Sequence, residues 1–379
     1  MSEIALTGCR IVTPDDVIAG SLLLRDGKIA AIDHGNSSIP GAVDCGGDIV
    51  MPGMIELHTD NLDKHIAPRP KVHWPAESAV VAHDAQIATA GITTVFDSIA
   101  VGDIHQGSDR IRTLTDMVKG LAACQEQEML RVEHFLHLRC EICHGGLQTY
   151  LDQLGTAPSL KLLSLMDHTP GQRQFADLKQ YETYYKNKYQ LSDADLEAFI
   201  IRCRADRAQH GDANRVAVID LARNLGIKLA SHDDATQAHA DEAAEAGAVV
   251  AEFPTTFDAA EALREHRIDV LSGAPNVVRG KSHSGNVSAL ALAERRLVDI
   301  LSSDYVPASL LPATFRLVDD LGYTLPEAVR LATANPAAAM GLDDRGRIEI
   351  GLRADVIRVT QRGSLPVVSM VWVEGERVA

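Results

Sequence analysis

Five apolar segments of the chain end at side chains of the kind that bind divalent metal ions. His58 and Asp60 follow residues 54–57, Glu141 follows 136–140, His168 follows 162–166, His232 follows 228–231, and Asp304 follows 298–303. A histidine behind one strand is usually a hydrogen-bonded structural residue, but five segments with the same ending favour one shared site. Imidazoles mixed with carboxylates suit Zn²⁺ or Mn²⁺, and a bridging carboxylate allows two ions that together activate a water.

Seven basic or imidazole side chains lie close in sequence to these candidates. They are Lys64, His65, Arg69, Arg173, Arg279, Lys281 and His283. Arginine matches phosphate oxygens with two parallel hydrogen bonds, and the last three share a Gly- and Ser-rich loop whose backbone N–H groups can approach phosphate. The alternative is that these loops are ordinary solvated surface. Side chains of this kind are those that a phosphate-bearing substrate would need near the candidate ligands.

The overall charge limits the classes of partner. Lys and Arg total 36 against 52 Asp and Glu, a net charge of −16, so we expect no binding to nucleic acid or anionic lipid. A phosphorylated substrate is repelled as well, unless the site itself collects cations. No segment approaches the roughly 20 apolar residues of a membrane span, and the start lacks the pattern of a signal peptide. We therefore expect a cytoplasmic protein with reduced cysteines, and a homodimer from base rates alone.

The candidate residues need a framework that brings strand ends together. Strand-like segments lie near 53–58, 92–97, 132–139, 160–167, 227–232, 247–253, 269–273 and 298–303. Helix-like segments alternate with them, as at 77–90, which ends before Gly91. Eight strands alternating with helices predict an α/β fold, a closed (β/α)8 TIM barrel whose carboxyl strand ends meet at one mouth.

The two ends of the chain predict a second, smaller unit. Short strands with turns fill residues 4–50, and similar segments return at 356–359 and 367–373. Neither end can bury a core alone, so we expect residues 1–50 and 345–379 to pair into a small β-sandwich domain, with the barrel at 51–344. The polar, Tyr-rich segment 171–210 is an expected helical excursion or lid over the mouth.

Several longer motifs carry a family resemblance. Residues 50–58 resemble the opening of the amidohydrolase superfamily, in which the first strand delivers a metal-binding H-x-H, although here Asp60 takes the second position. Residues 333–338 and 351–355 are similar to the tail of that superfamily. Residues 58–65, 164–175, 231–236, 273–280 and 302–309 resemble one branch of it, which acts in phosphonate degradation.

The resemblance implies a phosphorus–oxygen hydrolase. Its substrate would be a ribose carrying a 1-methylphosphonate and a 5-triphosphate, cleaved by water to the 5-phosphate and diphosphate. By analogy the metal shell, of one or two ions, would be His58, Asp60, Glu141, His168, His232 and Asp304. Glu141 would bridge the ions, and Asp304 would also accept a proton from the attacking water. One mismatch is that His168 and His232 follow the fourth and fifth predicted strands, whereas superfamily histidines usually follow the fifth and sixth.

Two other functions stay open. An amidohydrolase that cleaves a C–N bond, such as a cyclic amidase or a deaminase, is favoured by the superfamily as a whole but not by the cationic loops. A barrel without catalytic activity is the other alternative, although such scaffolds usually lack the ligand set that this sequence retains.

Overall fold

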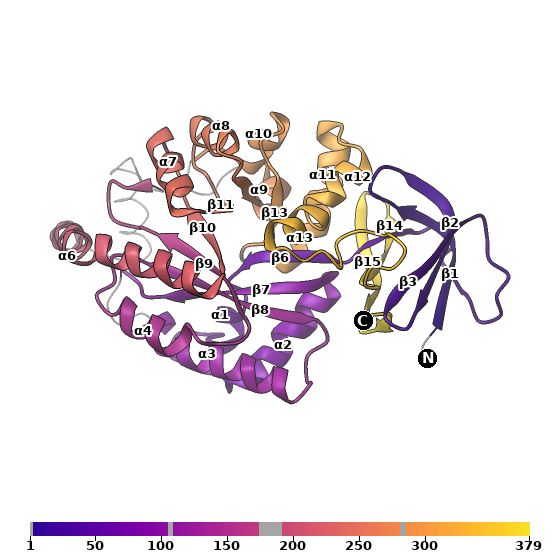
Figure 1. Cartoon of the computed structure of the whole chain (residues 1–379), viewed down its shortest axis with the longest axis horizontal. Helices are drawn as coiled ribbons and strands as arrows, with labels where there is room; N and C mark the ends of the chain where they lie inside the picture. Colours follow the sequence, from indigo (N-terminus) through magenta and orange to yellow (C-terminus); the bar gives the residue numbers. More distant parts are fainter. Residues whose placement is uncertain (1–2, 105–108, 174–191, 281–285) are drawn as a thin grey trace.

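A closed barrel of eight parallel strands forms the larger part of the molecule (Figure 1). The computed structural model describes residues 3–104, 109–173, 192–280 and 286–379. In chain order the strands are β6 (Met54–Thr59), β7 (Ile92–Val101), β8 (Glu133–Glu141), β9 (Leu160–Met166), β10 (Lys228–His232), β11 (Val250–Glu252), β12 (Asp269–Gly273) and β13 (Ile300–Ser302). Each pairs with the next, and a bridge between Thr59 and Asp304 joins the last to the first. All eight segments predicted from sequence are strands, and the predicted barrel is confirmed.

The closure of the barrel depends on Glu56, a fully buried carboxylate on β6. Its oxygens accept hydrogen bonds from the Ser302 hydroxyl at 2.7 Å and from the Ser303 backbone N–H at 2.5 Å. They also accept from the backbone N–H of His58 at 2.7 Å. One side chain therefore ties the first strand to the last and fixes the backbone that carries two candidate ligands.

Helices surround the barrel, and their ends follow local sequence signals. They are α1 (Leu62–Ile66), α2 (Ala76–Thr89), α3 (Asp109–Glu126), α4 (Leu147–Leu154), α6 (Asp193–Leu225), α7 (Gln237–Ala246), α8 (Phe257–Glu265), α9 (Ala274–Arg279), α10 (Ala289–Glu294), α11 (Leu310–Leu321), α12 (Leu325–Arg330) and α13 (Ala334–Met340), with a short 3₁₀ turn, η2 (Pro307–Ser309). Thr236 and Thr256 cap the N-termini of α7 and α8 with their hydroxyls. Gly91, with φ of +87°, follows α2 as predicted.

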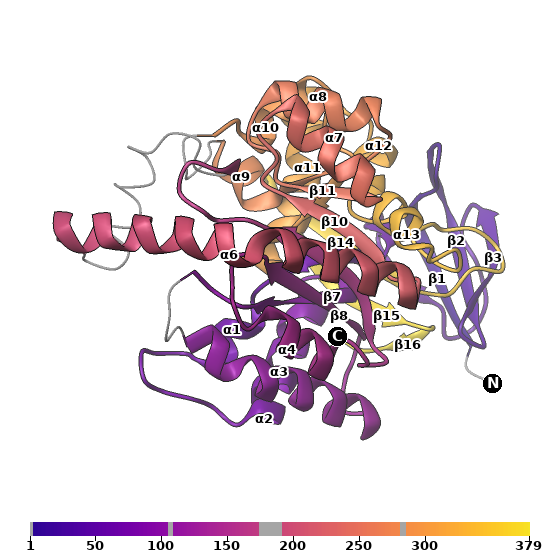
Figure 2. The same cartoon turned by 60° about the vertical axis from the view of Figure 1, so that its left-hand side comes forward.

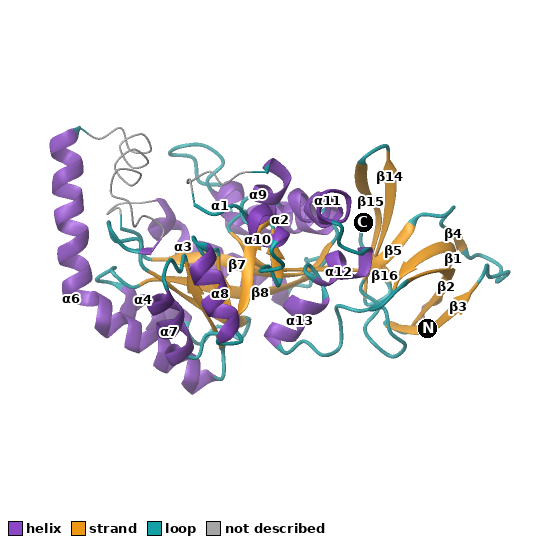
Figure 3. Cartoon of the chain, turned by 90° about the horizontal axis from the view of Figure 1, so that it is seen from above, coloured by secondary structure: helices purple, strands orange, loops and turns teal. Residues whose placement is uncertain are grey.

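The predicted excursion at 171–210 is helical in part. Helix α6 runs for 33 residues and extends beyond the barrel at the end far from the small sheet (Figures 2 and 3). Residues 174–191 lie outside the described residues, so a lid over the mouth stays a prediction. Within the described ranges, no helix is both long and apolar enough to cross a membrane.

Both chain ends build one mixed, mainly antiparallel sheet, and the two termini lie beside it (Figure 1). Its strands are β1 (Glu3–Val12), β2 (Val17–Arg25), β3 (Lys28–His34), β4 (Val43–Asp44), β5 (Ile49–Pro52), β14 (Val356–Arg362), β15 (Leu365–Val373) and β16 (Glu376–Arg377). Strand β14 pairs with β5, which joins the ends, and Trp372 shares a buried cluster with Leu24 and Ile29. The sheet therefore closes on its own apolar face, as a sandwich does. The first of the short strands expected within residues 4–50 is long, and it carries a bulge between Leu6 and Cys9. We propose residues 1–50 and 345–379 as the bounds of this domain.

A buried charged network joins α2 to the outer face of the barrel. Asp97 of β7 bonds to His83 of α2 at 2.8 Å and to His134 of β8 at 2.7 Å. His134 also contacts Asp84 at 3.4 Å, and Asp84 pairs with Arg131 at 2.9 Å. Burial opposes charge on His134, but Asp97 and Asp84 outweigh it and raise the pKa of His134 to about 9. The network holds the helix layer against β7 and β8.

Replacing Asp97 tests this network. Asp97→Asn leaves the buried His134 cation poorly paired, so the free energy of unfolding should fall by about 3 kcal/mol at neutral pH. The pKa of His134 rises on folding from 6.5 to about 9, so its contribution is complete below the lower value and is lost as pH rises through the upper one. The deficit of Asp97→Asn, measured by urea denaturation, should therefore shrink at about pH 10.

Asp241→Asn is the matched control, because Asp241 also pairs with a histidine, His266, but at an exposed site. It should leave stability nearly unchanged. Equal losses in the two variants, or a deficit that grows with pH, would contradict a charged network at Asp97.

Candidate metal centre

A fully buried carboxylate, Glu252, holds two histidines at the mouth of the barrel. Glu252 ends β11, and its two oxygens accept from Nδ1 of His58 at 2.8 Å and Nδ1 of His232 at 2.9 Å. The two rings stack with centroids 5.5 Å apart. Because Nδ1 of each ring faces Glu252, Nε2 of each ring points away from it, and one carboxylate sets the orientation of both imidazoles. Glu252 is not among the ligands predicted from the sequence, although it too ends an apolar segment.

A second group forms around His232 from the neighbouring strand ends. One ligand atom each from His168, His232 and Asp233 lies within 4.8 Å of the other two. Oδ2 of Asp233 is 3.4 Å from Nε2 of His232 and 3.8 Å from Nε2 of His168. That oxygen is buried and has no hydrogen-bond partner in the part of the chain that the structure describes, and Asp233 has a φ of +56°. A buried carboxylate oxygen that faces two imidazole nitrogens without a donor fits a bound divalent cation.

The predicted ligands Glu141, Asp60 and Asp304 surround this group. Glu141, at the end of β8, bonds through Oε2 to Nδ1 of His168 at 2.6 Å. Asp60 lies 3.7 Å from NH1 of Arg139, and the hydroxyl of Thr59 donates to the backbone oxygen of Asp304 at 2.7 Å. All six predicted ligands therefore lie at the mouth, but their ligand atoms do not form one cluster within 4.8 Å. His232 links the two groups of three.

Burial shifts the pKa values of several side chains at the mouth. Burial lowers the pKa of His232 to about 3, so its ring is neutral, the form that binds metals. Burial also raises the pKa of Asp233 to about 7. It raises that of Asp304 to about 7 as well, helped by the charge of Asp60. Nearby positive charge, including that of Arg139, offsets this effect of burial only in part, and a divalent cation would supply the rest.

The strand count resolves the mismatch noted in the sequence. Between Glu141 and His168 the chain forms α4 and then β9, and no further strand. Glu141, His168 and His232 thus follow the third, fourth and fifth barrel strands, and Glu252 ends the sixth. The ligand candidates are shifted by one strand relative to the usual superfamily histidines.

The predicted anion-binding residues lie in different surroundings. Lys64 donates to the backbone oxygen of Tyr305 and lies 5.3 Å from its ring centroid, beside Asp304. Arg173 is buried and already paired with Asp234 and Glu242. The remaining described candidates bond elsewhere or are exposed. His65 bonds to Gln86, Arg69 lies in an exposed turn, and Arg279 is exposed at the end of α9. Lys281 and His283 lie outside the described residues.

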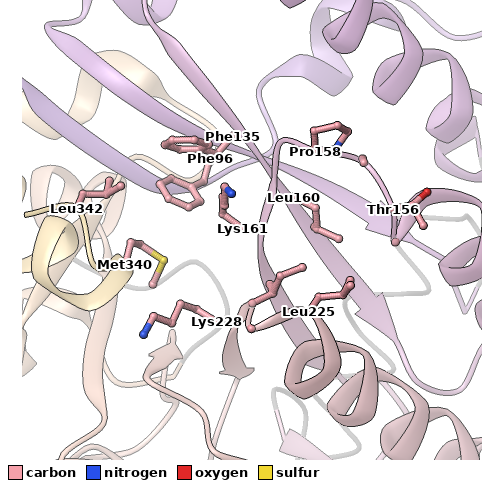
Figure 4. A pocket seen from close by; sticks show the side chains of 14 residues that line it. Phe96, Phe135, Thr156, Pro158, Leu160, Lys161, Leu225, Lys228, Met340 and Leu342 are labelled. Carbon is pink, nitrogen blue, oxygen red and sulfur yellow. The ribbon is translucent and has the colours of Figure 1, made fainter.

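The opposite end of the barrel holds a cavity of about 300 Å³ (Figure 4). Lys161 and Lys228, from the beginnings of β9 and β10, line it together with Phe96, Phe135 and Met340. Neither a histidine nor a carboxylate is among its lining residues. The cavity therefore lies apart from the candidate metal ligands, which are concentrated at the carboxyl ends of the strands.

Known proteins with similar sequences support one family. The model of the amidohydrolase family matches residues 76–379. The alpha-D-ribose 1-methylphosphonate 5-triphosphate diphosphatase of Escherichia coli (strain K12) is 48% identical over 375 residues, which covers 98% of this chain and 99% of that protein. The L-hydantoinase of Paenarthrobacter aurescens is 31% identical over 100 residues, 26% of this chain and 20% of that protein.

Solved structures share the fold at low sequence identity. A 5-methylcytosine deaminase from Klebsiella pneumoniae aligns with a TM-score of 0.68 and 14% identity, covering 99% of this chain and 97% of that one. An N-acetyl-D-glucosamine-6-phosphate deacetylase from Mycobacterium smegmatis aligns with a TM-score of 0.65 and 18% identity, covering 99% and 100%. With a closed barrel, strand-end ligands and a family match over most of its length, the chain belongs to the amidohydrolase family.

Proposed function

We propose that the chain hydrolyses alpha-D-ribose 1-methylphosphonate 5-triphosphate to the 5-phosphate and diphosphate, in phosphonate degradation. The observation that carries this proposal is the 48% identity, along nearly the whole of both chains, to the diphosphatase of that name. A cytoplasmic location and a homodimer are part of the same proposal.

One or two divalent ions, Zn²⁺ or Mn²⁺, belong to the proposed site. The proposed ligands are His58, Asp60, Glu141, His168, His232 and Asp304. The neutral ring of His232 and the unpartnered oxygen of Asp233 support a cation here. When bound, such an ion polarises phosphoryl oxygens and lowers the pKa of a water.

The residues of the chain would divide the remaining work. A carboxylate oxygen of Asp304 accepts the proton of the attacking water, whose oxygen forms a new bond to phosphorus. The bond between the α and β phosphates breaks, and diphosphate leaves with the electron pair. Lys64, beside Tyr305 at the rim, is the best placed of the proposed phosphate-binding residues. His65, Arg69, Arg173, Arg279, Lys281 and His283 complete that proposed set.

Hydrolysis of a C–N bond is the competing function, and the partial similarity to an L-hydantoinase favours it. The two functions yield different products. Diphosphate from a ribosyl 5-triphosphate supports the first, whereas ammonia or a ring-opened amide supports the second.

The decisive assay uses purified, metal-replete protein and the ribose 1-methylphosphonate 5-triphosphate. We expect release of one diphosphate per substrate, loss of turnover after chelation, and recovery with Zn²⁺ or Mn²⁺. Asp304→Asn should lower kcat by at least about 10²-fold, since proton transfer by a positioned base contributes about that much. Absence of diphosphate from the wild-type protein, with metal bound, would refute the proposed function.

Glu252→Gln tests the carboxylate that orients two histidines. An amide oxygen can accept from only one of the two Nδ1–H groups, so the other ring loses its orientation. We expect metal affinity, measured by competition with a chelator, to fall about 10- to 100-fold. Glu261→Gln, at an exposed glutamate paired with Arg295, is the control and should bind metal like the wild type. Equal affinity in Glu252→Gln would show that Glu252 does not position the ligands.

A further inference from the structure

Arg139 is a buried cation with few partners inside the barrel. It lies on β8 two residues before Glu141, so alternation along the strand directs both side chains to the same, inner face. Its side chain is 10% exposed, and its Nε has no hydrogen-bond partner among the described residues. The one ion pair that the structure describes for it is with Asp60, at 3.7 Å, longer than a hydrogen bond.

Other buried arginines of the chain are fully engaged. Arg345, 6% exposed, pairs with Glu133 and Asp344 and also donates to Thr94. Arg173 pairs with two carboxylates. A buried guanidinium without acceptors loses its hydration and gains little in return. The contrast indicates that the acceptors of Arg139 come from a bound ligand.

Arg139 lies close to candidate ligands from several strand ends. Its NH1 is 3.7 Å from Asp60, which follows β6, and Glu141, two residues further along β8 on the same inner face, bonds to His168 at 2.6 Å. Its charge also opposes part of the rise that burial causes in the pKa of Asp233 and Asp304. Arg139 therefore lies among the groups that would surround the reacting atoms, not at the rim with Lys64.

The chemistry of the proposed reaction supplies a ligand for this cation. Phosphoryl transfer spreads negative charge over several non-bridging oxygens and the leaving group, and a planar guanidinium fork matches such oxygens. We propose that Arg139 is a catalytic residue that donates hydrogen bonds to phosphate oxygens at the bond that breaks. It stays protonated while water bonds to phosphorus and diphosphate leaves with the electron pair. This inference rests on the proposed function and names the residue that adapts the barrel to polyphosphate.

A different role for Arg139 makes different predictions. If it only balances the carboxylates of the mouth, its loss should reduce metal content or stability and leave the affinity for phosphate oxygens unchanged. Binding of inorganic diphosphate, measured by calorimetry on metal-loaded protein, separates the two roles without turnover.

The test compares wild type, Arg139→Gln and Arg139→Lys, each with metal content measured. We expect Arg139→Gln to keep its metal, to bind inorganic diphosphate at least about tenfold more weakly, and to lose about 10²- to 10³-fold in kcat, as when one donor to a developing oxyanion is removed. Arg139→Lys keeps the charge but loses the fork, so its affinity and kcat should lie between the two. It also decides the question if Arg139→Gln fails to fold.

Arg345→Gln, at the fully paired buried arginine, is the matched control and should bind diphosphate like the wild type. Unchanged diphosphate affinity in Arg139→Gln, or wild-type kcat and affinity in Arg139→Lys, would overturn the inference. The diphosphate affinities do not depend on whether the wild type hydrolyses the ribosyl triphosphate, so failure of the proposed function is recognised separately.

Discussion

The gathering of buried carboxylates at one end of the barrel is the constraint on which the site depends. Glu141, Asp233 and Glu252 are buried, and Asp60 and Asp304 lie beside them, partly covered. Burial disfavours their charged forms unless positive charge lies within a few ångströms. His168 and Arg139 supply part of it, and bound divalent ions would supply the rest. Arg139 and bound divalent ions would place positive charge beside a polyanionic substrate even though the chain carries a net charge of −16.

The barrel creates this arrangement through two properties of parallel strands. Closure brings every carboxyl end to one mouth, and alternation along each strand sends every second side chain inward. On β8 the inward positions near the mouth are His137, Arg139 and Glu141, whereas His134 at the start of the strand faces α2. One strand thus contributes to the site on one face and to the buried network with Asp97 on the other. None of the candidate ligands lines the cavity at the far end of the barrel.

Much of the framework can be predicted from the sequence, because the spacing of apolar residues and the residues that end each element are local signals. The eight strands, the end of α2 before Gly91 and the clustering of strand-end ligands need only apolar runs followed by polar residues. Glu252 also ends an apolar segment, but that ending alone does not reveal its role, because the two rings that it orients are distant in sequence. Arg139 could not be found in this way. Arg139 lies inside an apolar run, where only closure of the barrel shows what it faces. For the same reason the sequence gives no sign that His83 and His134 share Asp97 as a partner.

The central claim is that imidazoles and carboxylates from separate strands meet around a cation at the mouth. Anomalous scattering from crystals grown with Mn²⁺ or Zn²⁺ tests it most directly. The account predicts a peak about 2.0–2.2 Å from an imidazole nitrogen of His232, within reach of the carboxylates around it. Absence of an anomalous peak at the mouth would contradict the claim. Metal bound only at His83, Asp97 and His134, the buried group on the outer side of the barrel, would contradict it as well.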